Sequence, residues 1–405
     1  MLPPPPFFLR KSLLSEWAIR YARRAVNEKK FPFSAVVAGA GISGATVAAR
    51  LAAAGLRVLV LEAKAHAGGN CYDCRDAGTG ILVHKYGTHI FHTDDKRAWD
   101  FLSRFTAWHP YFHKVLAQID GALVPVPFNL NSVRRVFPPV LAARIEEKLL
   151  ERFGFGARAT ILELRGSADA DLRLLGDYVY EKVFLHYTLK QWGKTPEEID
   201  PAVTARVPIF ASRDDGYFRD RYQAIPREGY TALIGNMLAH PNIELRLNTP
   251  WEAARACVPA GTPIFFTGAI DEFFGFKFGE LPYRSVSFEF VEYAREYFQP
   301  VACVNYPCHF DFTRIGEYKH FLGEKSPKTV VSFEYPAAFE RGKNERCYPI
   351  ANAETAALYA RYADEARRAF PQTRFLGRLG DYKYYDMDKA VLRALDAAEE
   401  FLRAF

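Results

Sequence analysis

The sequence predicts an α/β protein in which a Rossmann-like domain is interrupted by a helical insertion and an antiparallel β-sheet domain. Three observations predict this class. Residues 35–54 read as a buried strand, a glycine-rich turn and an alanine-rich helix. Residues 97–199 carry leucines and aromatics at three- and four-residue spacing, which is typical of helices. Residues 242–249, 285–293 and 328–336 are β-branched and aromatic, which is typical of strands.

The size and composition indicate a folded protein of more than one domain. The chain has 405 residues, and 49% hydrophobic content is sufficient for buried cores. No apolar run reaches the roughly 18 residues that a membrane span needs, and the first residues lack the pattern of an export signal. Six scattered cysteines are too few for a disulfide scaffold. We therefore expect a cytoplasmic protein with reduced cysteines.

Positive charge is concentrated at the N-terminus. Residues 1–33 contain seven basic and two acidic side chains, whereas the whole chain has a net charge of +6. The nearly neutral remainder argues against nucleic acid as the main partner, because binding a phosphate backbone needs a broad basic surface. Leu14, Trp17 and Tyr21 recur at helical spacing. The segment is either an amphipathic helix that contacts a membrane surface or a partner, or an extension that is poorly ordered or packed on the body.

The first elements form a dinucleotide-binding pattern. The predicted order is strand 35–38, helix 45–54 and strand 56–61. Between the first two, Gly39 permits a tight turn, Gly41 lets backbone N–H groups reach a pyrophosphate, and Gly44 lets the helix pack closely. Glu62 ends the second strand, where an acidic side chain accepts hydrogen bonds from a ribose hydroxyl. The helix N-terminus adds partial positive charge toward the anion.

Two further segments indicate which dinucleotide is bound. Glu62 is followed after five residues by Gly68 and Gly69, and residues 377–391 read GRLGDYKYYDMDKAV. Both segments resemble the large flavoprotein group with two dinucleotide-binding folds. In that group the second glycine pair runs beside FAD, and the closing motif brings the flavin end to a helix start. The resemblance favours FAD over NAD.

Seven segments narrow the resemblance. They are GGNCYD, HKYGTHIFHT, VPFNLNSV, KQWGKTPEEIDP, YQAIPREGYT, FTRIGEYKH and GRLGDYKYYDM, in this order along the chain. Together they resemble the bacterial type of the UDP-galactopyranose mutase family from about Ala35 onward. One departure is Thr88, because the family usually has Pro before the histidine that matches His89.

We expect a discontinuous domain organisation on this basis. The expected parts are a basic extension (1–33), a FAD-binding domain (34–96, 225–275 and 340–405), a helical domain with a substrate lid (97–199), and a β-sheet substrate domain (200–224 and 276–339). The resemblance also favours a homodimer.

The resemblance implies a UDP-galactose substrate whose diphosphate is held by Arg206 and Arg314. Arginine suits this role because its planar fork can bind two oxygens at once. The other implied substrate-binding residues are Tyr187 and Trp192 in the lid, with Tyr187 on the uracil, and Tyr217, Tyr348 and Tyr384 at the phosphates. The implied cofactor-binding residues are Gly39, Gly41, Ser43, Gly44, Glu62, Gly69, Asn70, His89, Arg378, Asp386 and Met387.

The implied reaction interconverts UDP-galactopyranose and UDP-galactofuranose, which is used for galactofuranose-containing glycans. N5 of reduced FAD forms a covalent adduct with the sugar, so no side-chain nucleophile is needed. The implied catalytic residues are Arg206, Arg314, His89 and Asp386. His89 is expected beside the isoalloxazine ring, and Asp386 is expected near the flavin and the sugar.

Several alternatives stay open. His84, His89 and His92 could bind a metal, although their spacing matches no common site and we expect none. Cys71 and Cys74 could form a redox dithiol, although packing cysteines are the commoner case. At the level of function, the alternatives are an FAD-dependent oxidoreductase of the amine oxidase type, a protein that keeps the fold without turnover, and a mutase for another UDP-pyranose.

Overall fold

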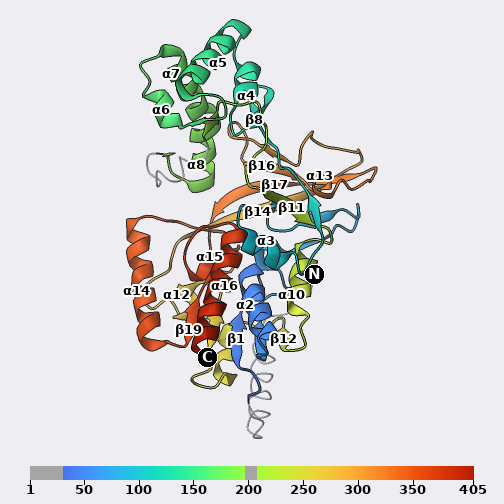
Figure 1. The fold of residues 1–405 in the computed structure, drawn as a ribbon, viewed down its shortest axis with the longest axis vertical. Helices are drawn as coiled ribbons and strands as arrows, with labels where there is room; N and C mark the ends of the chain where they lie inside the picture. Colours follow the sequence, from blue (N-terminus) through green and yellow to red (C-terminus); the bar gives the residue numbers. More distant parts are fainter. Residues whose placement is uncertain (1–30, 197–207) are drawn as a thin grey trace, which may run out of the picture.

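The computed structural model describes residues 31–196 and 208–405, and Figure 1 shows its fold. Most of the predicted basic extension lies outside the described residues. Phe33, the last residue of that extension, is buried in an apolar cluster with Trp251 and Phe266. The start of the folded body therefore lies slightly before the predicted boundary.

The parallel-sheet domain is built on five strands that are all parallel. Their order across the sheet is β12 (Ile243–Arg246), β2 (Val58–Leu61), β1 (Ala35–Ala38), β13 (Ile264–Phe266) and β19 (Thr373–Phe375). Helix α2 (Ile42–Ala53) follows β1 directly. The strand–turn–helix–strand order that the sequence predicts is confirmed. Strand β1 has the predicted bounds, and α2 begins three residues earlier than expected.

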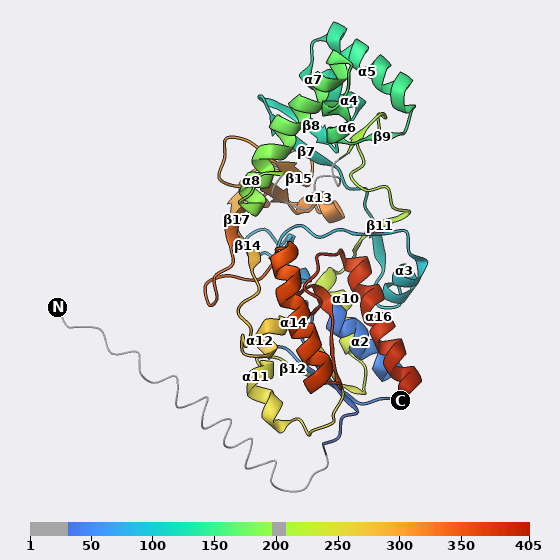
Figure 2. The same cartoon turned by 90° about the vertical axis from the view of Figure 1, so that its left-hand side faces the viewer.

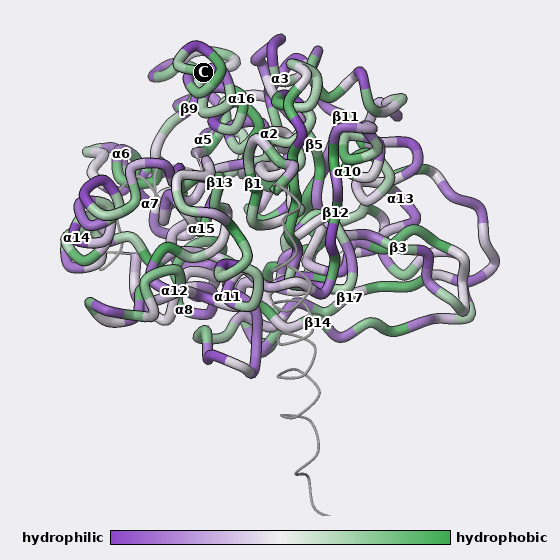
Figure 3. The backbone as a smooth tube through the Cα atoms, turned by 90° about the horizontal axis from the view of Figure 1, so that it is seen from below, coloured by the Kyte–Doolittle hydropathy of each residue, from purple (hydrophilic) through white to green (hydrophobic). Residues whose placement is uncertain are grey.

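Helices cover both faces of this sheet. On one face, residues of α2, α10 (Tyr230–Leu238) and α16 (Met387–Ala404) form one apolar cluster with Val37 and Val60. On the other face, α11 (Trp251–Ala254) and α12 (Ile270–Phe273) pack against Val36 and Leu59. Figure 3 shows α2 as mostly hydrophobic, whereas α14 (Ala353–Ala369) alternates between hydrophobic and hydrophilic residues. The short elements α15 (Gly377–Gly380) and η4 (Arg255–Cys257) complete the domain.

The second sheet has seven strands. Their order is β18 (Tyr348–Pro349), β14 (Tyr283–Tyr293), β17 (Thr329–Ala338), β16 (Arg314–Glu317), β15 (Cys303–Asn305), β7 (Val115–Ile119) and β8 (Ala122–Val126). All neighbouring pairs are antiparallel except β7 and β15, which are parallel. Figures 1 and 2 show this sheet between the parallel-sheet domain and a group of helices at the other end of the molecule.

Short elements connect the large ones. They are η1 (Gly69–Cys71), the pair β3 (Asp73–Arg75) and β4 (Leu82–His84), the sheet of β5 (Phe91–Thr93), β11 (Tyr222–Pro226) and β6 (Trp108–Pro110), α3 (Lys96–Leu102), the pair β9 (Arg158–Ala159) and β10 (Ile209–Phe210), and α13 (Lys319–Leu322).

The helical region shares one apolar core with strands β7 and β8 of the second sheet. It contains α4 (Leu130–Val136), α5 (Pro139–Phe153), α6 (Ile161–Arg165), α7 (Ala170–Val179), η2 (Tyr180–Leu185) and α8 (His186–Trp192). Asn129 and Thr160 begin α4 and α6 with capping boxes, which supply partners for the first backbone N–H groups. Phe128, Ile145 and Leu175 are buried in the core of this region.

The prediction of helix throughout residues 97–199 is wrong for residues 108–126. This stretch forms β6, β7 and β8, and the last two extend the seven-stranded sheet. Val115, Ala117 and Ile119 are buried whereas the residues between them are less so, which is the two-residue period of a strand. That period is visible over only five residues, between long helical patterns. The second sheet is antiparallel as expected, except that β7 pairs parallel to β15. Among the described residues, no helix is long and apolar enough to span a bilayer.

Candidate active site

The turn between β1 and α2 brings backbone very close to backbone. A Cβ on Gly44 would lie 1.9 Å from the carbonyl oxygen of Gly39, so only glycine permits this packing of helix on strand. Gly39 has φ of +108°, which an L side chain rarely adopts. Gly41 faces Gly69, and a Cβ on Gly41 would lie 3.6 Å from the Gly69 Cα. Gly68 pairs with Gly41 in an isolated bridge, so the two glycine segments run side by side.

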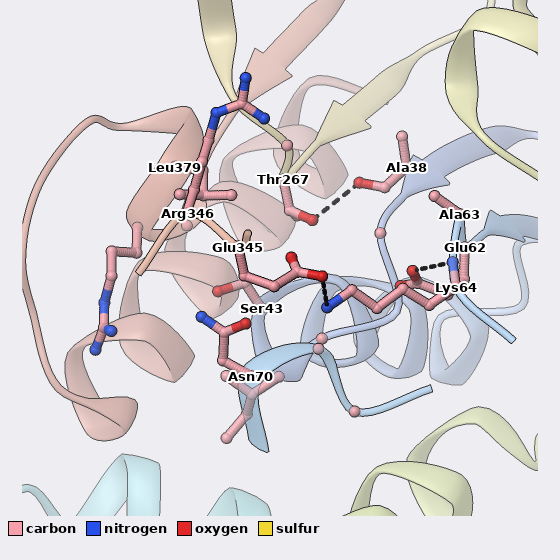
Figure 4. Close-up of a pocket in the computed structure, with 18 of the residues that line it drawn as sticks. Ala38, Ser43, Glu62, Ala63, Lys64, Asn70, Thr267, Glu345, Arg346 and Leu379 are labelled. Carbon is pink, nitrogen blue, oxygen red and sulfur yellow. Dashed lines mark hydrogen bonds and ion pairs between the residues drawn. The ribbon is translucent and has the colours of Figure 1, made fainter. Parts of the chain in front are cut away.

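These glycine segments form one wall of a cavity of about 500 Å³. Of the eleven predicted cofactor-binding residues, ten line this cavity: Gly39, Gly41, Ser43, Glu62, Gly69, Asn70, His89, Arg378, Asp386 and Met387. Gly44 does not line it and lies behind Gly39 instead. The structure thus brings together segments from both ends of the sequence around a single hollow. Figure 4 shows part of this lining.

Glu62 is anchored by backbone donors. The exposed fraction of Glu62 is 6%, and its Oε2 accepts a hydrogen bond from the Ala40 N–H at 2.8 Å. Its Oε1 accepts from the Lys64 N–H at 2.9 Å. Each carboxylate oxygen can accept a second bond. Glu62 therefore holds the end of β2 against the turn after β1 while its carboxylate lines the cavity.

Sequence reasoning missed the wall opposite the glycines. Phe339, Arg341, Glu345 and Arg346, which follow β17, line the cavity. Glu345 forms an ion pair with Lys64 at 3.0 Å, and Figure 4 shows the two side chains meeting across the cavity beside Ser43 and Asn70. No local motif marks this segment, because only the course of β17 across the second sheet brings it to the cavity.

The far end of the cavity carries His89, Arg378, Asp386 and Met387. Burial lowers the pKa of His89 to about 4, and the nearby Arg378 and Arg314 guanidinium groups add to this effect. The imidazole is therefore neutral at pH 7, and its Nδ1 has no hydrogen-bond partner. Arg378 donates from Nη2 to the Tyr385 carbonyl at 3.0 Å. Asp386 is the N-cap of α16, and Met387 accepts a weak hydrogen bond from the Cys71 thiol.

A cluster of tyrosines lies between Arg378 and Arg314. The Arg378 guanidinium lies over the Tyr384 ring at 4.9 Å and over the Tyr348 ring at 5.6 Å. The Tyr348 ring is 6.3 Å from the Trp192 ring. Burial raises the pKa of Tyr348, an effect that Tyr384 strengthens and Arg378 opposes. These four residues come from three separate segments of the chain.

Arg314 stands at the other side of this cluster. Its Nη2 donates to the Tyr187 hydroxyl at 3.4 Å, and its Nε donates to Asn305 Oδ1 at 3.1 Å. Burial raises the pKa of Tyr217 to about 12, although the Arg314 guanidinium acts in the opposite direction. The hydroxyls therefore stay protonated at pH 7 and can donate hydrogen bonds to an anion. Arg206, the second predicted diphosphate arginine, lies outside the described residues.

Two polar neighbours of Arg314 escaped sequence reasoning. Asn305 and Glu334 flank Arg314 on the adjacent strands, with Glu334 Oε2 3.8 Å from Arg314 Nη1. The strand pattern gives no signal for Glu334, because Thr329 to Ser332 are all buried and burial does not alternate along this part of the strand.

The alternative hypotheses for histidines and cysteines receive no geometric support. His84 is 1% exposed and stacks on Phe321, and burial lowers its pKa well below the usual value. His92 lies 3.0 Å from Asp220. Within residues 31–196 and 208–405, no group of three His, Cys, Asp or Glu side chains is placed to hold a metal ion. Cys71 is buried, which raises the pKa of its thiol to about 12 and makes it a poor nucleophile.

Comparisons with known proteins agree with this geometry. The family description "UDP-galactopyranose mutase" matches residues 182–384, and "NAD(P)-binding Rossmann-like domain" matches residues 37–105. A UDP-galactopyranose mutase of Mycoplasma pneumoniae is 38% identical over 93% of this chain and 98% of its own length. A dTDP-fucopyranose mutase of Escherichia coli is 34% identical over 91% of this chain and 98% of its own length.

Solved structures show the same fold. A crystal structure of reduced UDP-galactopyranose mutase matches with a TM-score of 0.68 at 14% identity, over 91% of this chain and 95% of that one. A redesigned putrescine oxidase matches with a TM-score of 0.55 at 11% identity, over 91% of this chain and 98% of that one. The glycine turn, the cavity and the sequence matches over nearly the whole chain lead to one conclusion: the chain belongs to the UDP-galactopyranose mutase family and is an isomerase with a flavin cofactor.

Proposed function

We propose that this enzyme interconverts UDP-galactopyranose and UDP-galactofuranose with reduced FAD, and so supplies galactofuranose for glycan synthesis. The observation that carries the proposal is the position of Arg314. Its guanidinium contacts Tyr187 and forms an ion pair with Glu334, and its charge affects the pKa values of Tyr217 and of His89 at the cofactor cavity. A diphosphate held there would present its sugar toward the cavity.

The residues present fit FAD. The approach of Gly41 to Gly69 leaves a backbone cradle that a Cβ would narrow, and the N-terminus of α2 offers free N–H groups to a pyrophosphate. Glu62 lines the cavity where a ribose hydroxyl can donate to its carboxylate. At the other end, the Nδ1 atom of His89 is buried without a partner, so it is available to a flavin polar atom. When bound, reduced FAD would supply a nucleophile at N5 for the anomeric carbon.

The protein side chains would then act on the diphosphate. Arg314, together with Arg206, would neutralise charge on the phosphates as the bond to the sugar breaks. Tyr217, Tyr348 and Tyr384 would donate hydroxyl protons in hydrogen bonds to phosphate oxygens, because burial keeps Tyr217 and Tyr348 protonated. Tyr187 and Trp192 would contact the nucleoside. Asp386, at the start of α16, would face the sugar and the flavin.

A second candidate reaction is the equivalent isomerisation of dTDP-fucopyranose. The match to the Escherichia coli dTDP-fucopyranose mutase is nearly as strong as the match to the Mycoplasma enzyme. An oxidoreductase of the amine oxidase type is the weaker alternative. Such an enzyme would have no use for a partly buried arginine that contacts a tyrosine hydroxyl beside its flavin site.

Purified enzyme should be yellow and should convert UDP-galactofuranose to UDP-galactopyranose only after reduction with dithionite, as followed by chromatography. Parallel reactions should use dTDP-fucofuranose. Conversion of the dTDP-sugar alone would transfer the proposal to that substrate. Bound flavin with no conversion of either sugar, and oxidation of an amine instead, would overturn the mutase proposal. The cytoplasmic location, the homodimer and the membrane-surface contact of residues 1–33 stay predictions.

A further inference from the structure

Arg314 occupies the centre of a polar row that crosses three strands. In the register of the second sheet, Arg314 on β16 is opposite Asn305 on β15 and opposite Glu334 on β17. Residues directly opposite each other on neighbouring strands have side chains on the same face. The diphosphate cation of the proposed function therefore has an amide on one side and a carboxylate on the other.

The two neighbours contact Arg314 differently. The Asn305 amide accepts a hydrogen bond from Nε at 3.1 Å, which fixes the plane of the guanidinium. Glu334 Oε2 is 3.8 Å from Nη1, which is an ion pair at a distance too long for a hydrogen bond. The charge of Glu334 thus attracts Nη1, but the two groups form no hydrogen bond.

Glu334 is a buried charge with incomplete pairing. Its exposed fraction is 8%, and its Oε1 has no hydrogen-bond partner. Burial raises the pKa of Glu334, whereas the Arg314 guanidinium and hydrogen bonding from the Thr88 backbone act in the opposite direction. Burying a carboxylate on the sheet beside Arg314 costs desolvation free energy, which an apolar residue at this position would not. Stability alone therefore does not explain a carboxylate here.

We propose that Glu334 is the resident counter-ion of Arg314 and that it weakens binding of the diphosphate, so that nucleotide sugar is released readily after each turnover. The inference rests on the proposed function, since it assumes that Arg314 holds a diphosphate. In the empty site the carboxylate balances the guanidinium. In the loaded site it lies beside a second anion and repels it. Tight binding of the ground state, which adds nothing to the chemical step, is thereby avoided.

Replacing Glu334 with glutamine separates the effect of charge from the effect of packing, because glutamine has the same shape without the charge. Glu334→Gln should bind UDP about three- to tenfold more tightly than the parent enzyme, as measured by calorimetry on the FAD-loaded protein at pH 8. The KM for the nucleotide sugar should fall by a similar factor without a rise in kcat. At this pH the other groups facing Glu334 are neutral apart from Arg314, because burial raises the pKa values of Tyr187, Tyr318, Tyr348 and Cys303.

Two variants serve as controls. Glu289→Gln removes an exposed carboxylate from the neighbouring strand β14 and should leave UDP affinity unchanged. Glu334→Asp keeps the charge and should bind UDP within about twofold of the parent, which guards against the case in which Glu334→Gln folds poorly. Thermal melting and flavin content should confirm that each variant is folded.

The outcomes are distinct. Unchanged or weaker UDP binding by folded Glu334→Gln would overturn the counter-ion role, and so would equal tightening in Glu334→Asp, because charge would then not be the cause. If the parent enzyme itself fails to bind UDP, the proposed function fails and Glu334 is not at issue.

Discussion

The cofactor cavity and the Arg314 cluster, which consists of Arg314 with Tyr187, Asn305 and Glu334, are built in different ways, although they adjoin. One wall of the cavity is made of backbone and small side chains from short contiguous motifs, such as Gly39 to Ser43 and Gly68 to Asn70. The Arg314 cluster consists of large side chains from α8, β15, β16 and β17, which meet only in the folded sheet. The comparison shows that one end of the active site is determined by local backbone geometry and the other by topology.

Because the glycine wall depends on close backbone contacts, we expect that one added methyl group can prevent flavin binding. Gly44→Ala places a Cβ 1.9 Å from the Gly39 carbonyl oxygen, so α2 must move away from β1. We expect loss of bound flavin in the purified protein and destabilisation by about 2–4 kcal/mol, measured by absorbance and by denaturant unfolding. The matched control is Gly235→Ala in α10, where a Cβ meets no atom within 4 Å. That variant should keep its flavin, and equal damage in both would contradict the close-packing argument.

Substitutions in the Arg314 cluster should lower activity without affecting flavin binding. Arg314→Ala should lower kcat/KM by at least about a hundredfold, because a charge-assisted contact to the diphosphate is lost in the transition state. Flavin content and the flavin spectrum should not change. Arg314→Lys keeps the charge but not the planar fork, so it should recover only part of the activity. An active alanine variant would show that the diphosphate is held elsewhere.

A smaller effect should follow from Trp192→Ala. Trp192 ends α8, and its ring faces the Tyr348 ring at 6.3 Å. Loss of the ring should raise KM about tenfold with little change in the flavin spectrum, since Trp192 does not line the cofactor cavity. Steady-state kinetics would check this result. A shifted flavin spectrum with an unchanged KM would show that Trp192 acts on the cofactor and not on the substrate.

The last expected effect concerns stability against acid and is nearly absent at neutral pH. His113 is 4% exposed, and burial lowers its pKa to about 3, with Arg314 adding to the shift. Between pH 6.5 and about 3 the unfolded chain binds a proton that the folded chain does not, so stability falls as the pH falls through this window. His113→Asn should reduce this loss by about 1 kcal/mol per pH unit in urea unfolding. The exposed His309→Asn should follow the parent, and an unchanged slope for His113→Asn would exclude its contribution.

The extent of prediction from sequence follows the same division. The residues around the cavity could be predicted because Gly39, Gly41 and Glu62 lie within one short motif whose geometry is almost fixed by the absence of side chains. The wall at Phe339 to Arg346 could not, since only the pairing of β14 with β17 carries it there. Arg314 could be identified by resemblance. Its partners Asn305 and Glu334 could not, because register between strands is not written in either strand alone.

The packing of α16 on α2 has a consequence for biosynthesis. The glycine turn is among the first parts of the body to be translated, whereas Arg378, Asp386 and Met387, which close the far end of the cavity, leave the ribosome long afterwards together with α16. No partly made chain has a complete cavity. A chain that stops before α16 should therefore fail to retain flavin, however well its first motif is formed.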